Sequence, residues 1–510
     1  MKNQNKRILS LLLAAMLALP ALASCGSGSS GDEAPAKEST AAADTAEAVE
    51  TEDPNARQNA KDNLPADLNY KGAKVTILAQ GAATGHLQDL NGFSDDDSDV
   101  LNDAIHQRNM KVEERLNVKL APDFLTDAWK DYRDMMKSLV ASGDTSHDFF
   151  YTMGNASIQS DNDVLFLDLA DAPYLDYEQP WWWINAMTEL SLDGKTFYYL
   201  VSEACISNYS CAGAAFFNKK LYTDYLGDPD DMYRTVLDGK WTLDKWGELS
   251  QKCYNDLNGN GIQDKGDLWG SYFGNVETLK EIEYATDLTR FTRDKDGYIQ
   301  FGYDIERAAQ LVEKLNKLLY ETKGLTYVSD LSAGDSYTIF ANGEEVFLIR
   351  QLSAAASATL REMEDDYGVI PQPKMDEKQK EYRSLIHNNS NFIVIPKTAA
   401  SNLERTCAVI EALSAESYRT VTDVYYEIAM KMKYSRDAYS GQCMDLIRET
   451  AVKSVLFEYN VPFKYGGTIV TTCVGANSND FASKYASVKS AAEAAITARM
   501  EQLAKEKAAG

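Results

Sequence analysis

The sequence predicts an α/β fold that contains at least one parallel sheet. Short apolar segments rich in β-branched residues alternate with segments whose apolar residues recur at helical spacing. This alternation favours parallel strands joined by right-handed helical crossovers. The length of 510 residues predicts about three domains, or two large lobes with tails. Because 44% of the residues are hydrophobic, the chain can bury large cores, which excludes wholesale disorder.

The first alternation of strands and helices spans residues 74–154. Strands are predicted at 74–79, 117–120 and 148–153, with helices between them at 100–116 and 128–141. Ligands of parallel sheets bind beyond the carboxyl ends of the strands. Asn155 follows the third strand at such an end, so it is a candidate ligand-binding residue, with a simple turn residue as the alternative.

The alternation continues along the rest of the chain. Further strands are predicted at 197–201, 214–217, 346–349 and 392–396, and Pro396 ends the last of them. Helices are predicted at 306–320, at 403–413 and from residue 482 onwards. The sequence contains no internal repeat.

The N-terminus has the pattern of an export signal. Lys2, Lys6 and Arg7 precede 16 mostly apolar residues, which is short for a membrane span and typical of a signal peptide over residues 1–24. Residues 22–25, Leu-Ala-Ser-Cys, resemble the lipobox of bacterial lipoproteins. The resemblance implies that Cys25 becomes the first residue, carries lipid such as palmitate and anchors the protein at the extracytoplasmic face of the membrane. An ordinary secretory signal with a chance cysteine is the alternative.

Residues 25–66 are expected to be the lipidated cysteine and a disordered acidic tether. After Cys25, nine acidic residues face three basic ones, and the first aromatic residue of the chain is Tyr70. Such a segment cannot bury enough apolar area to order itself.

Composition and motifs exclude several classes of function. The 77 acidic residues against 51 basic ones give a net charge of −26, which makes nucleic acid and anionic membrane surfaces poor partners. The four histidines have no metal-ligand spacing, and no HExxH, GxSxG or P-loop pattern occurs. Six cysteines follow Cys25, and they permit either disulfides or buried free thiols.

Residues 256–267 have the pattern of a calcium-binding loop. Oxygen-bearing side chains stand at loop positions 1, 3, 5, 9 and 12, a glycine stands at position 6, and position 7 offers a backbone carbonyl. The expected ligands are Asp256, Asn258, Asn260, Ile262, Asp264 and Asp267. Asp267 replaces the glutamate of a standard EF-hand at position 12. We expect a structural Ca²⁺ of weak or moderate affinity, with a solvated turn as the alternative.

Aromatic residues suggest a carbohydrate ligand, because the faces of pyranose rings pack on flat side chains. Three consecutive tryptophans stand at 181–183, and Trp269 follows the predicted calcium loop. Trp183 and Trp269 are therefore candidate ligand-binding residues. Glu203 and Arg350, which follow predicted strands, are further candidates, and Arg350 could hold a carboxylate through two hydrogen bonds. Core packing is the alternative for each tryptophan, and a surface ion pair is the alternative for Arg350.

Four segments resemble bacterial extracellular solute-binding proteins of family 1, which supply carbohydrates to ABC importers. They are Gly-Ala-Ala-Phe-Phe-Asn-Lys-Lys-Leu at 213–221, Gly-Lys-Trp-Thr-Leu-Asp-Lys-Trp at 239–246, Phe-Ala-Asn-Gly-Glu-Glu-Val-Phe at 340–347 and Tyr-Gly-Val-Ile-Pro-Gln-Pro-Lys at 367–374. Together with the lipobox and the tether, the resemblance covers about residues 70–500.

The resemblance implies a two-lobe, type II periplasmic-binding-protein fold with discontinuous lobes and a hinge. Lobe one is expected at 67–210 plus 389–440, lobe two at 211–388, and helices packing on both at 441–510. The protein would be a monomer without enzymatic activity that captures an oligosaccharide between the lobes and delivers it to an ABC permease. Residues 350–353 contain no aromatic residue, unlike maltose-type members, which disfavours maltodextrin and leaves room for an anionic or modified glycan.

Two other functions remain open at this stage. A surface-attached glycan-degrading enzyme needs only two well-placed carboxylates, and 77 acidic residues make a chance pair certain. The same two-lobe fold could also serve a peptide ligand or a sensor.

Overall fold

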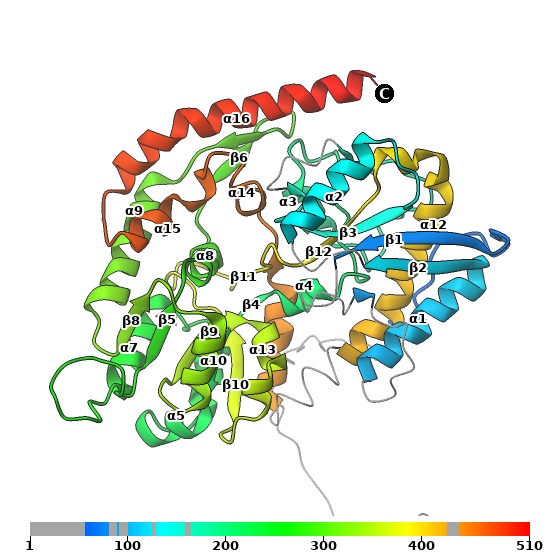
Figure 1. The fold of residues 1–510 in the computed structure, drawn as a ribbon. Helices are drawn as coiled ribbons and strands as arrows, with labels where there is room; N and C mark the ends of the chain where they lie inside the picture. The colour runs from blue at the N-terminus through cyan, green and yellow to red at the C-terminus, as the bar shows by residue number, and fades with distance from the viewer. Residues whose placement is uncertain are drawn as a thin grey trace, which may run out of the picture. The chain divides into compact units, whose positions relative to one another are not determined.

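Two separate sheets form the framework of the protein in the computed structural model (Figure 1). The structure describes residues 57–80, 89–90, 100–124, 129–158, 165–425 and 438–509. The predicted signal peptide 1–24, Cys25 and the tether as far as residue 56 lie outside these described residues. None of the helices in the described part is both long and apolar enough to cross a membrane.

The strands are β1 Ala73–Ala79, β2 Val118–Phe124, β3 Phe149–Met153, β4 Gly213–Asn218, β5 Ser271–Gly274, β6 Phe291–Arg293, β7 Ile299–Phe301, β8 Leu325–Val328, β9 Phe347–Gln351, β10 Tyr367–Pro371, β11 Ser384–Leu385, β12 Asn391–Val394 and β13 Ala451–Val452. The helices are α1 Val100–Leu116, α2 Trp129–Ala141, α3 Ile184–Leu190, α4 Ser207–Ser210, α5 Lys219–Tyr225, α6 Asp230–Leu237, α7 Leu243–Cys253, α8 Val276–Ala285, α9 Ile305–Asn316, α10 Ala333–Ala341, α11 Ala358–Arg361, α12 Leu403–Glu416, α13 Ala438–Glu449, α14 Val455–Glu458, α15 Ile469–Gly475 and α16 Phe481–Ala509.

The first sheet has the strand order β12-β3-β1-β2. β1 pairs in parallel with β2 and with β3, while β12 runs antiparallel to β3. All five residues of β3 are buried, as expected for a strand covered on both faces. The parallel β-α-β-α-β order predicted for residues 74–154 is confirmed.

The second sheet has the order β10-β4-β9 and is antiparallel throughout. Asn218 at the end of β4 caps α5 by accepting a hydrogen bond from the backbone of Leu221. Gly368 in β10 has no room for a side chain, because a Cβ atom there would overlap the ring of Phe217 and the hydroxyl of Tyr233. The sheet therefore packs tightly against the residues that cover it.

Three segments connect the two sheets, and we call 211–213, 384–387 and 450–453 the crossover segments. They lie side by side, since β11 pairs with β13 and Ala212 forms a bridge with Ile386. The middle segment carries the chain from β10 of the second sheet to β12 of the first. The predicted α/β fold with parts discontinuous in sequence is thus confirmed, whereas the residue boundaries of the lobes stay a prediction.

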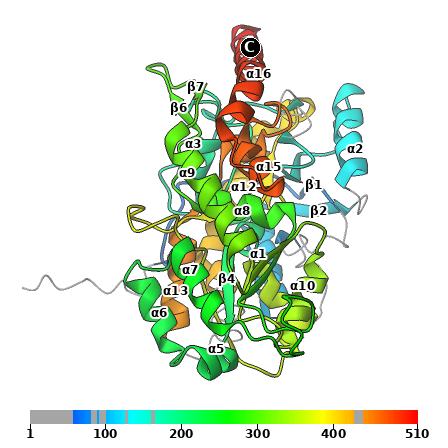
Figure 2. The ribbon, with the colours of Figure 1, turned by 90° about the vertical axis from the view of Figure 1, so that its left-hand side faces the viewer.

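The C-terminal helix contacts parts of the chain that lie near both sheets. α16 packs against α9, α15 and β7, and Figure 2 shows α8, α9 and α15 beside one another below it. Lys507 near its end forms an ion pair of 2.8 Å with Asp193, which follows α3. In Figure 1, α16 runs from the side of α9 to the side of α3.

Residues 57–66 differ from the predicted tether. Asp62 pairs with Arg115 of α1 and with Arg419, each at 2.6 Å, and Leu64 is buried in the main core. Burial by itself raises the pKa of Asp62, but hydrogen bonds from the two arginines outweigh it and bring the pKa to about 2. The composition alone could not reveal these contacts, because both arginines are distant in the chain.

The strand predicted at 197–201 is wrong. This segment forms a single bridge, between Leu200 and Ile393 of β12, and no ladder. Its apolar side chains are buried through ring contacts instead, with Tyr199 packing against Phe166 and Phe392. The apolar residues at 197–201 thus predicted burial correctly, but they did not predict strand pairing correctly.

The cysteines that follow Cys25 are buried. Cys205, Cys211, Cys253, Cys407 and Cys473 are free thiols, and Cys443 is also buried. Burial raises the pKa of Cys211, Cys253 and Cys407 to about 12. The burial of these side chains favours free thiols over disulfides.

Candidate functional site

Charged side chains gather where the crossover segments meet the ends of β3 and β9. Arg350 lies in β9 and is only 7% exposed. Its guanidinium donates to Ser336 Oγ at 2.9 and 2.7 Å and to Thr278 Oγ1. Among the described residues no carboxylate lies within ion-pair distance of it, so the surface ion pair considered as its alternative is absent there. The guanidinium therefore has no direct ion-pair partner there, while its charge acts on the buried carboxylates of Glu281 and Glu345 at longer range.

Glu281 of α8 lies on the same side of the second sheet. It is buried and accepts hydrogen bonds from Gln351 at 2.5 Å and from Gln372 at 3.5 Å. Burial raises the pKa of Glu281, and the nearby His387 and Arg350 oppose that shift. Asn275, at φ 61°, caps the helix by accepting from the backbone of Glu277 and Thr278, which orients this face of α8.

His387 in the middle crossover segment connects α8 to the end of β3. Its Nε2 lies 3.5 Å from Glu277 Oε2, and its Nδ1 accepts from the backbone N–H of Asn389 at 3.3 Å. Asn155 donates from Nδ2 to Asn389 Oδ1 at 3.1 Å. Burial by itself raises the pKa of Glu277, but the hydrogen bond from His387 and the charge of Lys280 outweigh it and bring the pKa to about 2.

Lys453 and Glu458 form a fully buried pair beside the third crossover segment. Their closest atoms, Nζ and Oε1, are 3.3 Å apart, and Nζ also donates to Ser390 Oγ. Burial raises the pKa of Glu458, whereas Lys453 lowers it. Glu458 also lies directly against Gly154, where a Cβ atom would overlap its Oε2.

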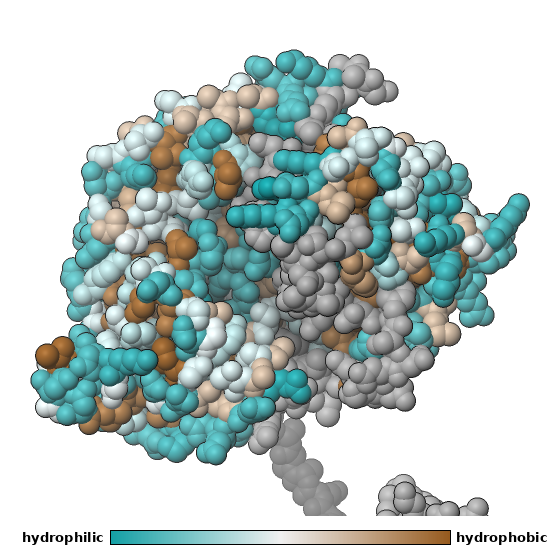
Figure 3. Space-filling view, viewed as in Figure 1, coloured by the Kyte–Doolittle hydropathy of each residue, from teal (hydrophilic) through white to brown (hydrophobic). Residues whose placement is uncertain are grey.

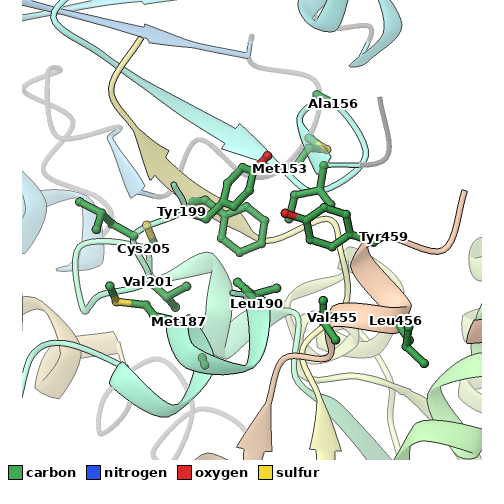
Figure 4. Close-up of a cluster of buried hydrophobic side chains, with 14 of the residues drawn as sticks. Met153, Ala156, Met187, Leu190, Tyr199, Val201, Cys205, Val455, Leu456 and Tyr459 are labelled. Carbon is green, nitrogen blue, oxygen red and sulfur yellow. The ribbon is translucent and has the colours of Figure 1, made fainter. Parts of the chain in front are cut away.

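An apolar cluster holds Glu458 in this place (Figure 4). Val455, the first residue of α14, and Tyr459, which follows the helix, face Leu190 of α3 and Tyr199. Met153 at the end of β3 belongs to the same cluster. The third crossover segment is thereby fixed to the part of the chain that carries the first sheet.

We call Glu277, Glu281, Arg350, His387, Lys453 and Glu458, with Asn155, the crossover cluster. Two buried polar atoms that have no hydrogen-bond partner among the described residues lie in or beside it, Gln372 Oε1 and Glu458 Oε2. Such atoms are rare in folded proteins unless water or a ligand satisfies them. Figure 3 shows that the surface is hollowed beside α8 and that the visible part of the hollow is hydrophilic. The arrangement can therefore bind a polar molecule through both donors and acceptors.

Trp183 and Glu203 lie together in a second place. The Trp183 indole donates to Glu203 Oε1 at 3.4 Å, and its ring meets the edge of Tyr209 at 5.1 Å. Glu203 also accepts from Tyr209 and Thr422 and pairs with Arg57 at 3.4 Å. These contacts explain the burial of Glu203 without a ligand, and a ligand-binding role for this pair stays a prediction.

The other two tryptophans of the triplet are core residues. Trp181 and Trp182 are buried, and their indole N–H groups donate to the two carboxylate oxygens of Glu411, each at 3.0 Å. Burial raises the pKa of Glu411 to about 8, although these hydrogen bonds lower it.

Trp269 lies beside the predicted calcium loop. Its indole donates to the carbonyl of Asp264 at 3.2 Å, and its ring meets Tyr254 and Tyr272 edge-on. It is 5% exposed, so packing accounts for its position. Its predicted role as a ligand-binding residue is untested.

The loop itself is organised by its own side chains. Asp256 accepts from the backbone N–H groups of Gly259 and Gly261, and the amides of Asn258 and Asn260 donate to Asp264. Asp267 Oδ2 accepts from Tyr254 and from the backbone of Asp264, whereas its Oδ1 is buried without a partner. Ile262 is 64% exposed. Across the described residues, no group of three or more His, Cys, Asp or Glu side chains is placed to hold a metal ion.

The predicted site residues therefore fall in three places. Asn155 and Arg350 belong to the crossover cluster, Trp183 and Glu203 contact each other, and Trp269 lies at the loop. Sequence reasoning missed the other five members of the crossover cluster, Glu277, Glu281, His387, Lys453 and Glu458. A usable signal existed for two of them, because Lys453 and Glu458 are charged residues inside an otherwise apolar segment, Ala-Val-Lys-Ser-Val-Leu-Phe-Glu at 451–458.

Comparisons with known proteins give a likeness of fold only. No protein-family model matches the sequence, and no curated protein matches it. A solved structure of maltose-bound MalE3 from T. maritima is similar over 83% of this chain and 99% of that chain, with 12% identity and a TM-score of 0.49. The GacH receptor of Streptomyces glaucescens is similar over 85% of this chain and 99% of that one, with 11% identity and a TM-score of 0.48. The fold described above rests on the sheets and crossovers themselves.

Proposed function

We propose that the protein is an extracytoplasmic solute-binding protein that holds a carbohydrate at the crossover cluster. The observation that carries the proposal is the cluster's construction. Asn155 at the end of β3 and Arg350 in β9 come from different sheets and are linked through Asn389, His387 and α8. Sugar hydroxyls need both donors and acceptors, and the cluster supplies both, with buried atoms that still lack partners.

The mechanism is binding without chemistry. Lobe one, at 67–210 plus 389–440, and lobe two, at 211–388, would move about the crossover segments, which are short and lie side by side. A ligand that contacts both lobes stabilises the closed state in proportion to its differential affinity for that state. The closed form would deliver the oligosaccharide to an ABC permease, while lipid on Cys25 keeps the monomer at the membrane.

The test is a thermal-shift screen of the purified protein with neutral and acidic mono- and oligosaccharides, and with peptides. A specific ligand at 100 times its Kd adds about 2.7 kcal/mol of stability. We expect a saturable shift with one glycan class, recovery of the glycan intact, and weaker binding by Arg350→Gln than by the exposed control Arg361→Gln. A shift with peptides alone would reject the carbohydrate, and cleavage of the glycan would identify an enzyme.

We further propose that residues 256–267 hold a structural Ca²⁺. The donor set is all oxygen, as calcium requires, and the partnerless Oδ1 of Asp267 is the feature that favours a cation there. Titration calorimetry should detect CaCl₂ binding that Asp256→Asn weakens and that the exposed control Asp296→Asn leaves unchanged. Equal binding by both variants would place the cation elsewhere.

Membrane attachment through Cys25 is proposed from the sequence pattern alone. Cys25→Ala should move the protein from the membrane fraction to the soluble fraction of the cells that export it. Retention of the variant in the membrane fraction would reject the lipid anchor.

A further inference from the structure

A separate cavity is lined by part of the third crossover segment and by Arg383, which directly precedes the middle one. Its volume is about 280 Å³, near the lower end of the 300–1,000 Å³ typical of small-molecule sites. Its charged lining comes from four segments and consists of Glu189, Asp287, Arg290, Arg293, Arg383 and Lys453. Four cationic side chains around one small cavity are unexpected in a chain with a net charge of −26.

Three of these four cations have partners in the protein. Arg290 pairs with Glu283 at 3.3 Å and donates to backbone carbonyls at 2.7 and 2.9 Å. Arg293 donates to the carbonyls of Thr188, Ser191 and Gly297, each at 2.8 Å. Lys453 is paired with Glu458. These side chains are fixed, so they shape the wall of the cavity and its potential.

Arg383 is different. It is half-buried, it lines the cavity, and its side chain forms no hydrogen bond or ion pair with any residue in the described part of the chain. Burial lowers the pKa of Arg383 and the positive charge of Arg290 lowers it further, whereas the carboxylates of Glu189, Asp287 and Glu381 oppose this shift. Two guanidinium groups that repel each other beside an open cavity are stabilised by an anion placed between them.

Glu189 of α3 faces the same space and also has no hydrogen bond or ion pair in the described residues. Burial raises the pKa of Glu189, while Arg293 and Arg383 lower it. An ionised carboxylate at Glu189 repels an anionic ligand. Neutralising Glu189 should therefore raise the affinity for an anion, whereas neutralising Arg383 should lower it. An anion site in this cavity can therefore be tested with one substitution that weakens anion binding and one that strengthens it.

We propose that this cavity binds the oxyanion group of a small ligand, with Arg383 donating two hydrogen bonds to it. A planar guanidinium matches the paired oxygens of a carboxylate or a sulfate. The oxyanion could belong to an acidic saccharide or be free in solution. The saccharide source rests on the proposed carbohydrate function, whereas the anion site itself does not.

The experiment measures affinity by titration calorimetry at constant ionic strength, with galacturonate, galactose and sodium sulfate as probes. The variants are Arg383→Gln, Glu189→Gln and the matched surface control Arg234→Gln, which lies half-exposed on α6 among aspartates. Circular dichroism and the Tm without ligand establish that each variant is folded. Should Arg383→Gln fail to fold, Glu189→Gln alone still tests the site.

We expect galacturonate or sulfate to bind the wild type. Arg383→Gln should weaken that binding by about tenfold or more, Glu189→Gln should strengthen it, and Arg234→Gln should leave it unchanged. Equal affinity for galacturonate and galactose, or an unchanged affinity in Arg383→Gln, would overturn the proposal and leave carbohydrate binding intact. Binding of sulfate that depends on Arg383, with no saccharide bound anywhere, would support the anion site and reject the proposed function.

Discussion

The loop at 256–267 and the crossover cluster are built in opposite ways. The loop takes all of its oxygen atoms from twelve consecutive residues, and most of its hydrogen bonds join residues no more than six positions apart. The crossover cluster takes its residues from positions between 155 and 458, so its contacts join residues separated by as many as 234 positions. A locally built site can be recognised from spacing, whereas a site assembled by the topology depends on the whole fold for its geometry.

The largest expected effect comes from breaking the buried ion pair between Lys453 and Glu458 in the crossover cluster. Lys453→Met leaves Glu458 buried without its cation, which should lower the free energy of unfolding by about 3–5 kcal/mol. The double variant Lys453→Met/Glu458→Met should lose less than the single one, because it removes the uncompensated charge. Urea unfolding of both measures this difference. A single variant that loses less than about 1 kcal/mol would show that the pair is not held as tightly as the structure indicates.

The second prediction concerns Glu411 of α12, the buried carboxylate that accepts hydrogen bonds from Trp181 and Trp182. Burial raises the pKa of Glu411 to about 8, from 4.5 for an ordinary glutamate, so the folded protein retains a proton that the unfolded chain releases. Stability contributed by this group is therefore present below pH 4.5 and is lost as the pH rises to 8, on the order of a few kcal/mol in total. Glu411→Gln should flatten thermal stability across this window, and Glu404→Gln on the same helix should not. Parallel slopes for Glu411→Gln and the wild type would contradict the assignment.

A smaller effect is expected from filling the space between β3 and Glu458. Gly154→Ala introduces a Cβ atom that overlaps Glu458 Oε2, so the strand end or the buried pair must shift. We expect a loss of about 1–3 kcal/mol, as for overpacked cores, together with weaker ligand binding. Chemical denaturation and calorimetry on one preparation give both values. Unchanged binding with lowered stability would separate Gly154 from the site.

The smallest effect belongs to the loop. Gly261 has φ +74° with open space around it, so Gly261→Ala costs only the backbone conformation, about 1 kcal/mol. Because the loop is local, this change should reduce the calcium response without altering saccharide affinity. A loss of saccharide affinity would show that the loop and the crossover cluster are coupled.

Much of the architecture could be predicted because its signals are local. The first three strands and their two helices follow from periodicity over residues 74–154, and the strand at 392–396 follows from four apolar residues before Pro396. The segment at 197–201 carries the same apolar signal and forms no strand, because its side chains, and not its backbone, join the core. Periodicity reports burial, and it reports pairing only where a neighbouring strand is in register.

The predicted site was partly assembled by the fold. The sequence predicts Asn155 and Arg350 at the ends of strands, and the structure places both in one cluster, since the crossover segments bring the ends of the two sheets together. Trp183 and Glu203 contact each other away from this cluster, and Trp269 contacts the loop at 256–267. Distances in the sequence carry no information about which strand ends meet, so this division could not be foreseen.

The sequence by itself therefore determined the α/β class, the order of most elements and the oxygen pattern of the loop, because each depends on residues within about one helix or strand of one another. The tertiary structure alone decided that residues 57–66 are held by Arg115 and Arg419 and that Lys453 meets Glu458. It also left Arg383 beside a cavity with no hydrogen bond or ion pair among the residues that the structure describes. The physical reason is that the energy of a charge is set by the groups that surround it in space, and those groups are assembled only when the chain folds.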